Sequence, residues 1–258
     1  MKTKDRFRKN EPIRQAHKVI KELKAKYIKP TRLYKLYRIL KAKTYTAYAG
    51  WGEDILLERI YRQHPRRSSG IFVDVGCNNP VIGSTTWKLY KWGWRGLNLD
   101  LTKENIDLCK ILRPRDVSVQ CAITSHEGSV NSYIFDPGSG LNTLDKEFAD
   151  EWAKKINKPY HVVPIDCRTL DQAIEDHLGV EKIDLLTVDV ENHEFEVLST
   201  FSFQKYSPDF ILCEVHGKSI EDVLKTRTCK LIKSNGYLFI SYTGGTALFV
   251  KDGIDYTI

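Results

Sequence analysis

The segment that decides the fold is residues 70–79, Gly70-Ile71-Phe72-Val73-Asp74-Val75-Gly76-Cys77-Asn78-Asn79. Apolar and β-branched residues run into an acid and then into a glycine and small polar residues. This pattern is typical of a buried parallel strand that ends in a tight turn. Open α/β sheets bind ligands just beyond the carboxyl ends of their strands. We therefore expect Asp74 to hold a cationic or hydroxyl-bearing part of a ligand. Gly76 has no Cβ and would let that ligand approach the backbone.

A second expected strand, residues 96–100, ends in Asp100. An acid at this position usually binds the two hydroxyls of an adenosine ribose, so the two strands together indicate a cofactor that contains adenosine. Binding of a pyrophosphate needs the pattern G-x-G-x-x-G, whereas here Gly76 is followed by Cys-Asn-Asn and by Pro80, which has no N–H. S-adenosylmethionine fits these features, with Asp100 at the ribose and Asp74, Gly76 and Asn78 at the methionine end.

Length and composition favour a globular protein. The 258 residues are 41% hydrophobic, enough for one large α/β domain with an appendage. No run approaches the ~18 apolar residues that span a bilayer, and the charged N-terminus lacks an apolar signal core, which predicts a cytoplasmic protein. The six cysteines show no C-x-x-C spacing, so we expect reduced, buried thiols and no metal site made by them.

The positive charge is confined to the N-terminus. Residues 1–45 hold 16 Lys or Arg against three acids, a net charge of +13, and the remainder, with 24 basic and 30 acidic residues, is at −6. This contrast predicts a basic arm over 1–45 and a separate domain over 46–258. It also argues against a catalytic face that is itself a nucleic-acid groove.

Two amphipathic helices are expected in the arm. Apolar residues follow a helical period between Pro12 and Pro30, and again from Leu33 to Leu40. Either the helices pack their apolar stripes on the main domain, or the arm attaches peripherally to an anionic membrane, where each basic residue contributes ~1 kcal/mol. Binding of nucleic acid by the arm is a third, weaker alternative.

From residue 46 onward, strands alternate with helices, which predicts an α/β fold with a mostly parallel sheet. Helices are expected over 53–61, 103–111, 144–155, 168–177 and 220–233. Strands are expected to end at Asp74 and to run over 96–100, 117–122, 183–190 and 211–215, with extended segments at 129–135 and 160–164. A terminal hairpin, 237–242 and 246–250, adds an antiparallel edge.

Acids also follow two later strands. Asp189 should lie at the carboxyl end of the fourth strand and face the same crevice as Asp74, since an acid there has little structural use. Glu191 could be functional or structural, whereas the acids at 194 and 196 are best explained as residues that begin a helix. The fifth strand places Glu214 and His216 on one side. His216 is either a general base or a structural residue.

The chain resembles the FkbM-type methyltransferases over most of residues 46–250. The matching segments are Gly52-Glu53-Asp54-Ile55-Leu56-Leu57, Phe72 to Gly76, Asn79-Pro80, Ser84-Thr85-Thr86, Gly93 to Asp100, Arg113 to Asp116, Leu141 to Leu144 and Ile183 to Leu198. Two departures are Asn192, where the family usually has glycine, and Cys77, where it usually has alanine. Asn tolerates the left-handed backbone that such a glycine adopts. The arm lies outside the resemblance.

This resemblance implies a Rossmann-like class I methyltransferase fold, with a seven-stranded sheet that carries a reversed hairpin strand. It also implies transfer of a methyl group from S-adenosylmethionine to a hydroxyl, frequently on a sugar of a glycan or glycosylated product. We expect Ala122 and Ile123 to face the adenine, and Asp189 and His216 to flank the acceptor hydroxyl, either one as base.

The remaining expected site residues surround the acceptor. Glu191 joins the catalytic group, and Glu53, Asp54 and Glu214 contact the substrate or support its neighbours. A divalent ion is not demanded; if present, it would find oxygen ligands in Asp189, Glu191 and Glu214. Among the tryptophans, we expect Trp94 in the core, whereas Trp152, near the glycine-bearing loop 137–142, could contact the acceptor.

Three alternatives stay open. An NAD-dependent oxidoreductase is disfavoured by the missing glycines. A nucleic-acid methyltransferase guided by the basic arm would commonly carry an Asn/Asp-Pro-Pro-Tyr-like motif after the fourth strand, where this chain has Asp-Val-Glu-Asn. A non-catalytic module that binds a membrane or a partner enzyme would not need Asp189.

Overall fold

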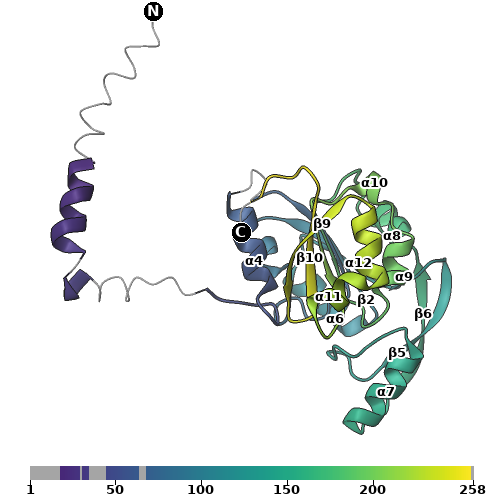
Figure 1. Ribbon diagram of the computed structural model, residues 1–258. Coiled ribbons are helices and arrows are strands. Elements are labelled where there is room, and N and C mark those ends of the chain that lie inside the picture. The colour runs from purple at the N-terminus through teal and green to yellow at the C-terminus, as the bar shows by residue number, and fades with distance from the viewer. Residues whose placement is uncertain (1–17, 30, 35–44, 64–67, 257–258) are drawn as a thin grey trace, which may run out of the picture. The chain divides into compact units, whose positions relative to one another are not determined.

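In the computed structural model, the described residues are 18–29, 31–34, 45–63 and 68–256. The chain divides into two compact units, residues 1–46 and 47–258, and each is described by itself. Figure 1 shows the elements of the larger unit, a sheet with helices on its two faces.

A seven-stranded sheet forms the centre of the larger unit, with the strand order β3-β2-β1-β7-β8-β10-β9. The strands are β1 (Ile71–Val75), β2 (Arg95–Asp100), β3 (Val117–Gln120), β7 (Leu185–Val188), β8 (Phe210–Glu214), β9 (Tyr237–Thr243) and β10 (Thr246–Lys251). All neighbours from β3 to β8 pair in parallel, whereas β10 pairs antiparallel with both β8 and β9. The expected α/β class, the seven strands and the reversed hairpin are thus confirmed.

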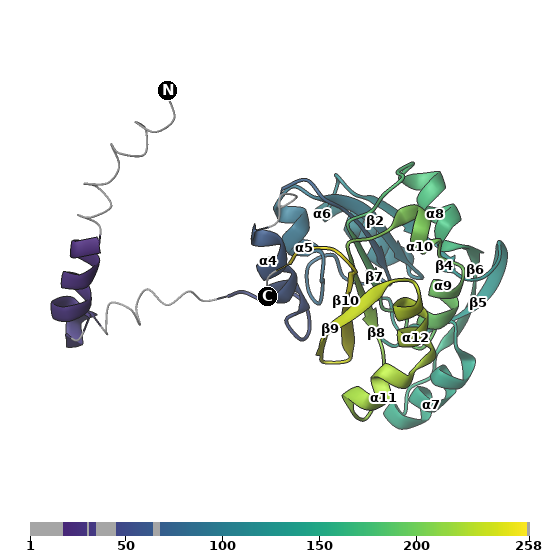
Figure 2. The ribbon, with the colours of Figure 1, turned by 45° about the horizontal axis from the view of Figure 1, so that its top comes forward.

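The strand order reverses between β1 and β7, because β2 and β3 follow on one side of β1 and β7 and β8 on the other. Such a switch point leaves a crevice beyond the carboxyl ends of the strands. Asp74 is directly paired with Thr187 across this boundary. The sheet therefore places the ends of β1 and β7 side by side. Figure 2 labels β7 in this sheet, together with β2, β8, β9 and β10.

Helices cover both faces of the sheet. On one face the core contains residues of β1, β2, β7, β8 and β10 together with α8 (Leu170–His177), α9 (Glu194–Ser199), α10 (Phe203–Tyr206) and α12 (Arg227–Ser234). On the other face Phe72, Phe210 and Leu248 pack against α4 (Glu53–Gln63) and α5 (Trp87–Lys91). Trp94 is fully buried in this second core, as expected.

A smaller sheet of three strands lies in the same unit. Its order is β4-β6-β5, formed by β4 (Ala122–Ile123), β5 (Gly128–Ile134) and β6 (His161–Arg168). The expected strand 117–122 is wrong at its end, because β3 stops at Gln120 and the chain leaves the main sheet. The Cys121 N–H still bonds the Asp100 carbonyl, and Ala122 already pairs with Cys167.

The expected helix 220–233 is also wrong, because the structure has two helices, α11 (Ile220–Lys225) and α12. Thr226 between them is extended, with ψ at 156°, and its hydroxyl accepts a hydrogen bond from the Cys229 N–H. Threonine is a favoured N-cap because its side chain satisfies an otherwise unpaired N–H. The other expected helices are α4, α6 (Lys103–Leu112), α7 (Lys146–Ile156) and α8, with bounds that differ by up to two residues.

The N-terminal unit has helical residues at 18–23, a π-helical turn η1 (Lys24–Ile28) and a short helical stretch at 32–34. This agrees with a first helix between the two prolines. The second expected helix lies largely outside the described residues. Within the part of the chain that the structure describes, no helix is long and apolar enough to cross a membrane.

All six cysteines are free thiols and all are buried. Burial raises the pKa of Cys213 well above its ordinary value and that of Cys121 to about 11, so these thiols stay protonated. The sulfurs of Cys77 and Cys109 lie 3.9 Å apart. The expectation of reduced, buried thiols is confirmed.

Candidate active site

An open pocket lies at the switch point between β1 and β7 and encloses about 950 Å³ of empty space, including solvent at its mouth. The loops after β1, β2 and β7 form its walls, with Gly140 and neighbouring residues closing one side. Seven of the expected site residues line it: Asp74, Gly76, Asn78, Asp100, Ile123, Asp189 and Glu191. The other five, Ala122, Glu53, Asp54, Glu214 and His216, are not among the lining residues.

Asp74 is held from both sides at the base of the pocket. Its two carboxylate oxygens accept hydrogen bonds from the Thr187 hydroxyl at 2.8 Å and the Thr86 hydroxyl at 2.6 Å. Thr86 also accepts a bond at 3.0 Å from the fully buried Arg113, whose Nε lies 2.7 Å from Asp116. Asp74 is 3% exposed and is held in place by these two hydrogen bonds, and each of its oxygens keeps one lone pair.

Asp100 organises the loop after β2. One of its oxygens accepts hydrogen bonds from the N–H and hydroxyl of Thr102 and from the Asn105 amide, and the other from the Asn78 N–H at 2.9 Å. Burial raises the pKa of Asp100, and these hydrogen bonds oppose that rise. Asn78 has φ at 45°, a left-handed conformation that Asn tolerates. The oxygen that bonds Asn78 keeps one lone pair for a hydroxyl donor.

The loops after β1 and β7 touch at Gly76. Its φ is 81°, and an added Cβ would lie 1.7 Å from the carbonyl oxygen of Asp189. The Asp189 N–H in turn bonds the Val75 carbonyl at 3.0 Å. The missing Cβ at residue 76 therefore makes room for the backbone of Asp189, which is what brings the Asp189 carboxylate to the pocket.

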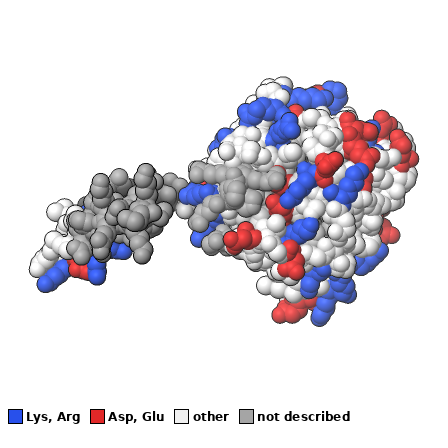
Figure 3. Space-filling model, turned by 90° about the horizontal axis from the view of Figure 1, so that it is seen from above, with Lys and Arg blue, Asp and Glu red and all other residues white. Residues whose placement is uncertain are grey.

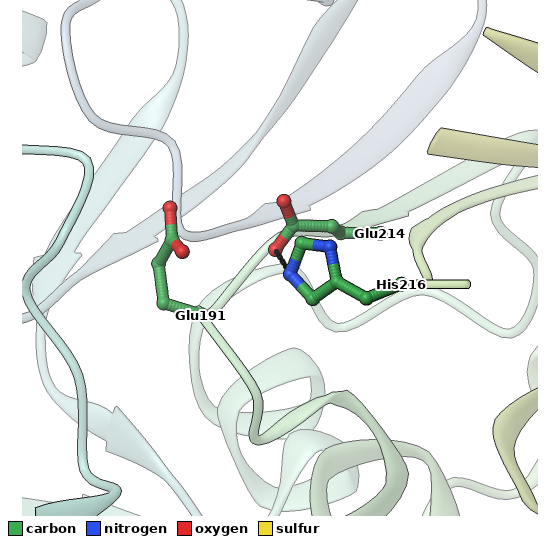
Figure 4. Close-up of side chains that lie close together, drawn as sticks. All are labelled: Glu191, Glu214 and His216. Atoms are coloured by element: carbon green, nitrogen blue, oxygen red, sulfur yellow. Dashed lines mark ion pairs between the residues drawn. The ribbon is translucent and has the colours of Figure 1, made fainter. Parts of the chain in front are cut away.

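Carboxyl groups cluster beside Asp189, and Figure 4 shows two of them, Glu191 and Glu214, together with His216. Glu191, Glu214 and His216 each offer a ligand atom within 4.8 Å of the others' atoms, and His216 Nε2 lies 3.6 Å from Glu214 Oε2. Protonated, Glu214 donates a hydrogen bond to Asp189. The oxygens of Glu191 and Glu214 and the ring nitrogen of His216 could hold a divalent ion. These residues come from two loops, after β7 and at the end of β8, that meet beyond the sheet.

The cluster binds protons more tightly than separate carboxylates would. Loss of bulk water and the nearby acids raise the pKa of Asp189 to about 6 although its side chain is open to the pocket. The same causes raise the pKa of Glu191 to about 8 and that of Glu214 to about 10. Burial raises the pKa of Glu194 to about 7. At neutral pH, Asp189 is thus the ionised member and Glu214 a protonated one.

The charged residues that line the pocket are acidic. Asp74, Asp100, Asp189 and Glu191 line it, and no Lys or Arg is among its described lining residues. Elsewhere on the larger unit the charges are mixed, with acidic and basic side chains interspersed over the face in Figure 3. The pocket therefore suits a ligand that carries positive charge.

Apolar side chains form the wall next to Asp100. Leu99, Leu101, Cys121, Ile123 and Leu144 line this part of the pocket. A flat aromatic base would find apolar contacts here, beside the carboxylate that can bind a ribose. Ala122 is fully buried and faces the small core of Ile165 and Cys167 instead.

Residues of the Gly52-Glu53-Asp54 segment lie near Asp189 but are not among the residues that line the pocket. Glu53 is 5% exposed and near enough to raise the pKa of Asp189, and its carboxylate lies 3.4 Å from the Thr246 hydroxyl. Asp54 is fully buried, accepts a hydrogen bond from the Tyr48 N–H and pairs with Lys88 at 3.2 Å. Asp54 is therefore placed to support this segment, without contact to the pocket.

The sequence analysis missed Trp51 and His193. Trp51 is 68% exposed, and its backbone N–H donates a hydrogen bond to the Glu53 carboxylate at 3.0 Å. Its ring packs on the hairpin turn at Gly244, where an added Cβ would lie 1.8 Å from the ring. His193 lines the pocket, and burial lowers its pKa. His193 falls in the acidic stretch that was singled out, whereas the place of Trp51 depends on a hairpin almost 200 residues away in sequence.

A family model described as the methyltransferase FkbM domain matches residues 74–239. The match begins at Asp74, at the end of β1, and ends inside β9. It therefore spans the pocket loops after β1, β2 and β7. No curated protein matched the sequence.

Solved structures with a similar arrangement are distant. The methyltransferase FkbM of Methylobacillus flagellatus KT is 14% identical at a TM-score of 0.45, and the match covers 71% of this chain and 44% of that one. This chain thus spans less than half of that protein. A TehB-like SAM-dependent methyltransferase of Corynebacterium glutamicum is 16% identical at a TM-score of 0.41, covering 85% and 96% of the two chains. An O-methyltransferase of Bacillus cereus, in complex with SAH, is 12% identical at a TM-score of 0.37, covering 90% and 97%.

The raised pKa values predict that the protein loses stability as the pH rises. A carboxyl group with a raised pKa in the folded state binds more protons folded than unfolded, so the free energy of unfolding falls above its ordinary pKa of 4.5. Between about pH 6.5 and about pH 8 we expect the free energy of unfolding to fall, with about 2 kcal/mol of the loss due to Glu191 alone, measured by urea unfolding. Glu191→Gln should make this loss smaller. An equal free energy of unfolding at the two pH values would contradict the raised pKa of Glu191.

Proposed function

This chain belongs to the methyltransferase FkbM domain family, and we propose that it transfers a methyl group from S-adenosylmethionine to a hydroxyl of a sugar in a glycan or glycosylated product. The observation that supports this cofactor is the pocket, whose lining includes four acidic residues and, among the described residues, no lysine or arginine. One of the four, Glu191, is mostly protonated at neutral pH because its pKa is raised to about 8. The family match supports the reaction class. The arrangement around Asp189 supports a hydroxyl acceptor.

The pocket fits the charge and shape of S-adenosylmethionine. Its sulfonium and ammonium groups outweigh its carboxylate, so the cofactor is a net cation and matches the acidic lining. Asp100 would bind the ribose hydroxyls, and the apolar wall around Leu99 and Ile123 would contact the adenine. A nicotinamide dinucleotide carries a pyrophosphate, whose negative charge would meet Asp74, Asp100 and Asp189 with no lysine or arginine among the described lining residues.

Methyl transfer from a sulfonium is an in-line displacement. When bound, the cofactor supplies an electrophilic methyl carbon and a good leaving group. The protein must hold the acceptor oxygen close to that carbon and in line with the departing sulfur, and such placement can supply ~7–11 kcal/mol. Asp189 lies at the pocket and is fixed by the contact of its backbone with Gly76, so it is well placed to orient an acceptor hydroxyl.

Asp189 is the residue that we propose as general base. An alcohol is a poor nucleophile, and its proton must leave as the oxygen attacks. With a pKa near 6, Asp189 is ionised at neutral pH yet more basic than an ordinary aspartate. Glu214, protonated, donates to Asp189 and holds its carboxylate in place. His216 has a 57% exposed side chain that contacts Glu214, and it is not among the residues that line the pocket. His216 is therefore the weaker candidate for the base.

The acceptor side offers features that suit a sugar. Trp51 presents an exposed ring that is seated directly on Gly244, and aromatic faces stack on sugar rings. Glu53 anchors the Trp51 backbone and lies beside Thr246, which pairs with Glu214 in the sheet. Trp51 and the carboxyl cluster thus flank one area, in which a sugar could stack while its hydroxyls reach carboxylates.

Binding of the cofactor product tests the proposal directly. S-adenosylhomocysteine at a hundred times its dissociation constant should raise the free energy of unfolding by about 2.7 kcal/mol, because it binds only the folded protein. A thermal-shift titration measures this effect. NADH, as the control ligand, should produce no shift. A shift with NADH and none with S-adenosylhomocysteine would support an oxidoreductase instead.

The base is tested by comparing Asp189→Asn with His216→Asn. Asp189→Asn should lower kcat by about 10²- to 10⁴-fold, the usual contribution of a positioned base, and leave the affinity for S-adenosylhomocysteine unchanged. His216→Asn should cost less than about tenfold. Transfer of tritiated methyl groups from S-adenosylmethionine to acceptor glycosides measures kcat for both variants. A large loss with His216→Asn alone would move the role of base to His216.

Trp51→Ala should raise KM for the sugar acceptor by about tenfold, since loss of an aromatic contact costs about 1.5 kcal/mol, whereas Trp51→Phe should retain most of the affinity. Trp152→Ala, on α7 and away from the pocket lining, is the matched control and should leave KM unchanged. An unchanged KM for Trp51→Ala would exclude Trp51 from the acceptor site.

A further inference from the structure

The N-terminal unit carries a stripe of apolar side chains that no described residue of that unit covers. Residues 18–29 are helical or π-helical up to residue 28, and every one of them is exposed. The stripe consists of Val19, Ile20, Leu23, Tyr27 and Ile28, which are between 46% and 62% exposed. Since apolar side chains gain free energy by leaving water, such a stripe is typical of a surface that binds a partner.

The π-helical turn keeps this stripe continuous. In an α-helix, Tyr27 would lie on the face of Leu23 but Ile28, five residues after Leu23, would point away. In η1 the Lys29 N–H bonds the Lys24 carbonyl at 2.9 Å, a bond between residues five apart. This wider turn brings Ile28 back toward the face of Leu23. A π-turn is rare and is frequently found at functional positions.

The rest of this segment is basic. Five lysines, at positions 18, 21, 24, 26 and 29, accompany a single acid, Glu22. Lys26 Nζ lies 5.2 Å from the centre of the Tyr27 ring, so one lysine borders the stripe directly. Lysine side chains beside an apolar stripe can lay their methylene groups along it while the ammonium groups reach the polar surface.

From these contacts and charges we propose that residues 18–29 bind an anionic lipid bilayer as an interfacial helix, with the stripe turned into the headgroup region. The basic side chains match anionic headgroups, and the whole of 1–45 carries 16 basic and three acidic residues. Nucleic acid would account for the lysines but leave the apolar stripe in water. We place the segment along the membrane, because the described helical residues 18–28 are too few to cross it.

Two substitutions in the full-length protein separate apolar insertion from charge alone. Leu23→Glu and Ala25→Glu each add one acid at an exposed helical position, but only the first interrupts the stripe. Flotation should show binding of the wild type to vesicles that contain about one third phosphatidylserine, and weak binding to phosphatidylcholine alone. Leu23→Glu should bind about tenfold more weakly than Ala25→Glu, as expected when one leucine stays in water. Thermal unfolding of both variants checks that the larger unit is intact.

Several results would overturn the proposal. If the wild type does not float with the anionic vesicles, the stripe has another partner, such as the larger unit of this chain. If the two variants weaken binding equally, the attraction is only electrostatic and the stripe plays no part. If single-stranded RNA competes with the vesicles and binds both variants as tightly as the wild type, the arm is a nucleic-acid ligand.

Discussion

The site depends on the contact between two backbone segments at the centre of the sheet. Gly76, after β1, lies so close to the Asp189 carbonyl that any Cβ would be 1.7 Å from it. Because of this contact, the loop after β1 and the loop after β7, which carries the proposed base Asp189, share one wall of the pocket. A side chain at residue 76 would separate them, and placement of reacting groups is worth far more than any single hydrogen bond in the pocket.

The second constraint is electrostatic. Asp189, Glu191 and Glu214 lie together, with His216 beside Glu214 but no lysine or arginine paired with them among the described residues, and their mutual repulsion costs stability. A fold optimised for stability alone would not collect acids in this way. By contrast, the buried carboxylates away from the pocket are paired, as in Asp54 with Lys88 and Asp116 with Arg113. The acids next to the proposed reaction have no such lysine or arginine partner among the described residues.

Much of the fold could be predicted from local patterns. The strand expected to end at Asp74, the strand over 96–100 with the helix after it, and the final hairpin follow from apolar runs, glycines and acids that are adjacent in sequence. The short helix α5 after the first strand was not predicted. The division of 220–233 into two helices could not be predicted, because a capping threonine also occurs within helices. The departure of the chain after Gln120 depends on pairing with residues more than 40 positions later.

The candidate site was predictable to a similar extent. Acids at strand ends indicated Asp74, Asp100 and Asp189, since the carboxyl ends of parallel strands meet at one edge. The sequence could not show that Asp74 has both oxygens bonded to threonines, nor that Glu214 reaches Asp189. Trp51 was missed because its place is set by a glycine of the distant hairpin turn.

The buried thiols can report on two different motions of the protein, because they lie in two different places. Cys213 and Cys229 lie in the main core, so a thiol reagent reaches them only when helices separate from the sheet. Cys77, in the loop after β1, and Cys121, directly after β3, both line the pocket, although Cys121 also packs against the main core. Opening of these two segments would expose the second pair while the first stays covered. Alkylation rates at the two pairs would therefore distinguish loop motion at the pocket from unfolding of the sheet.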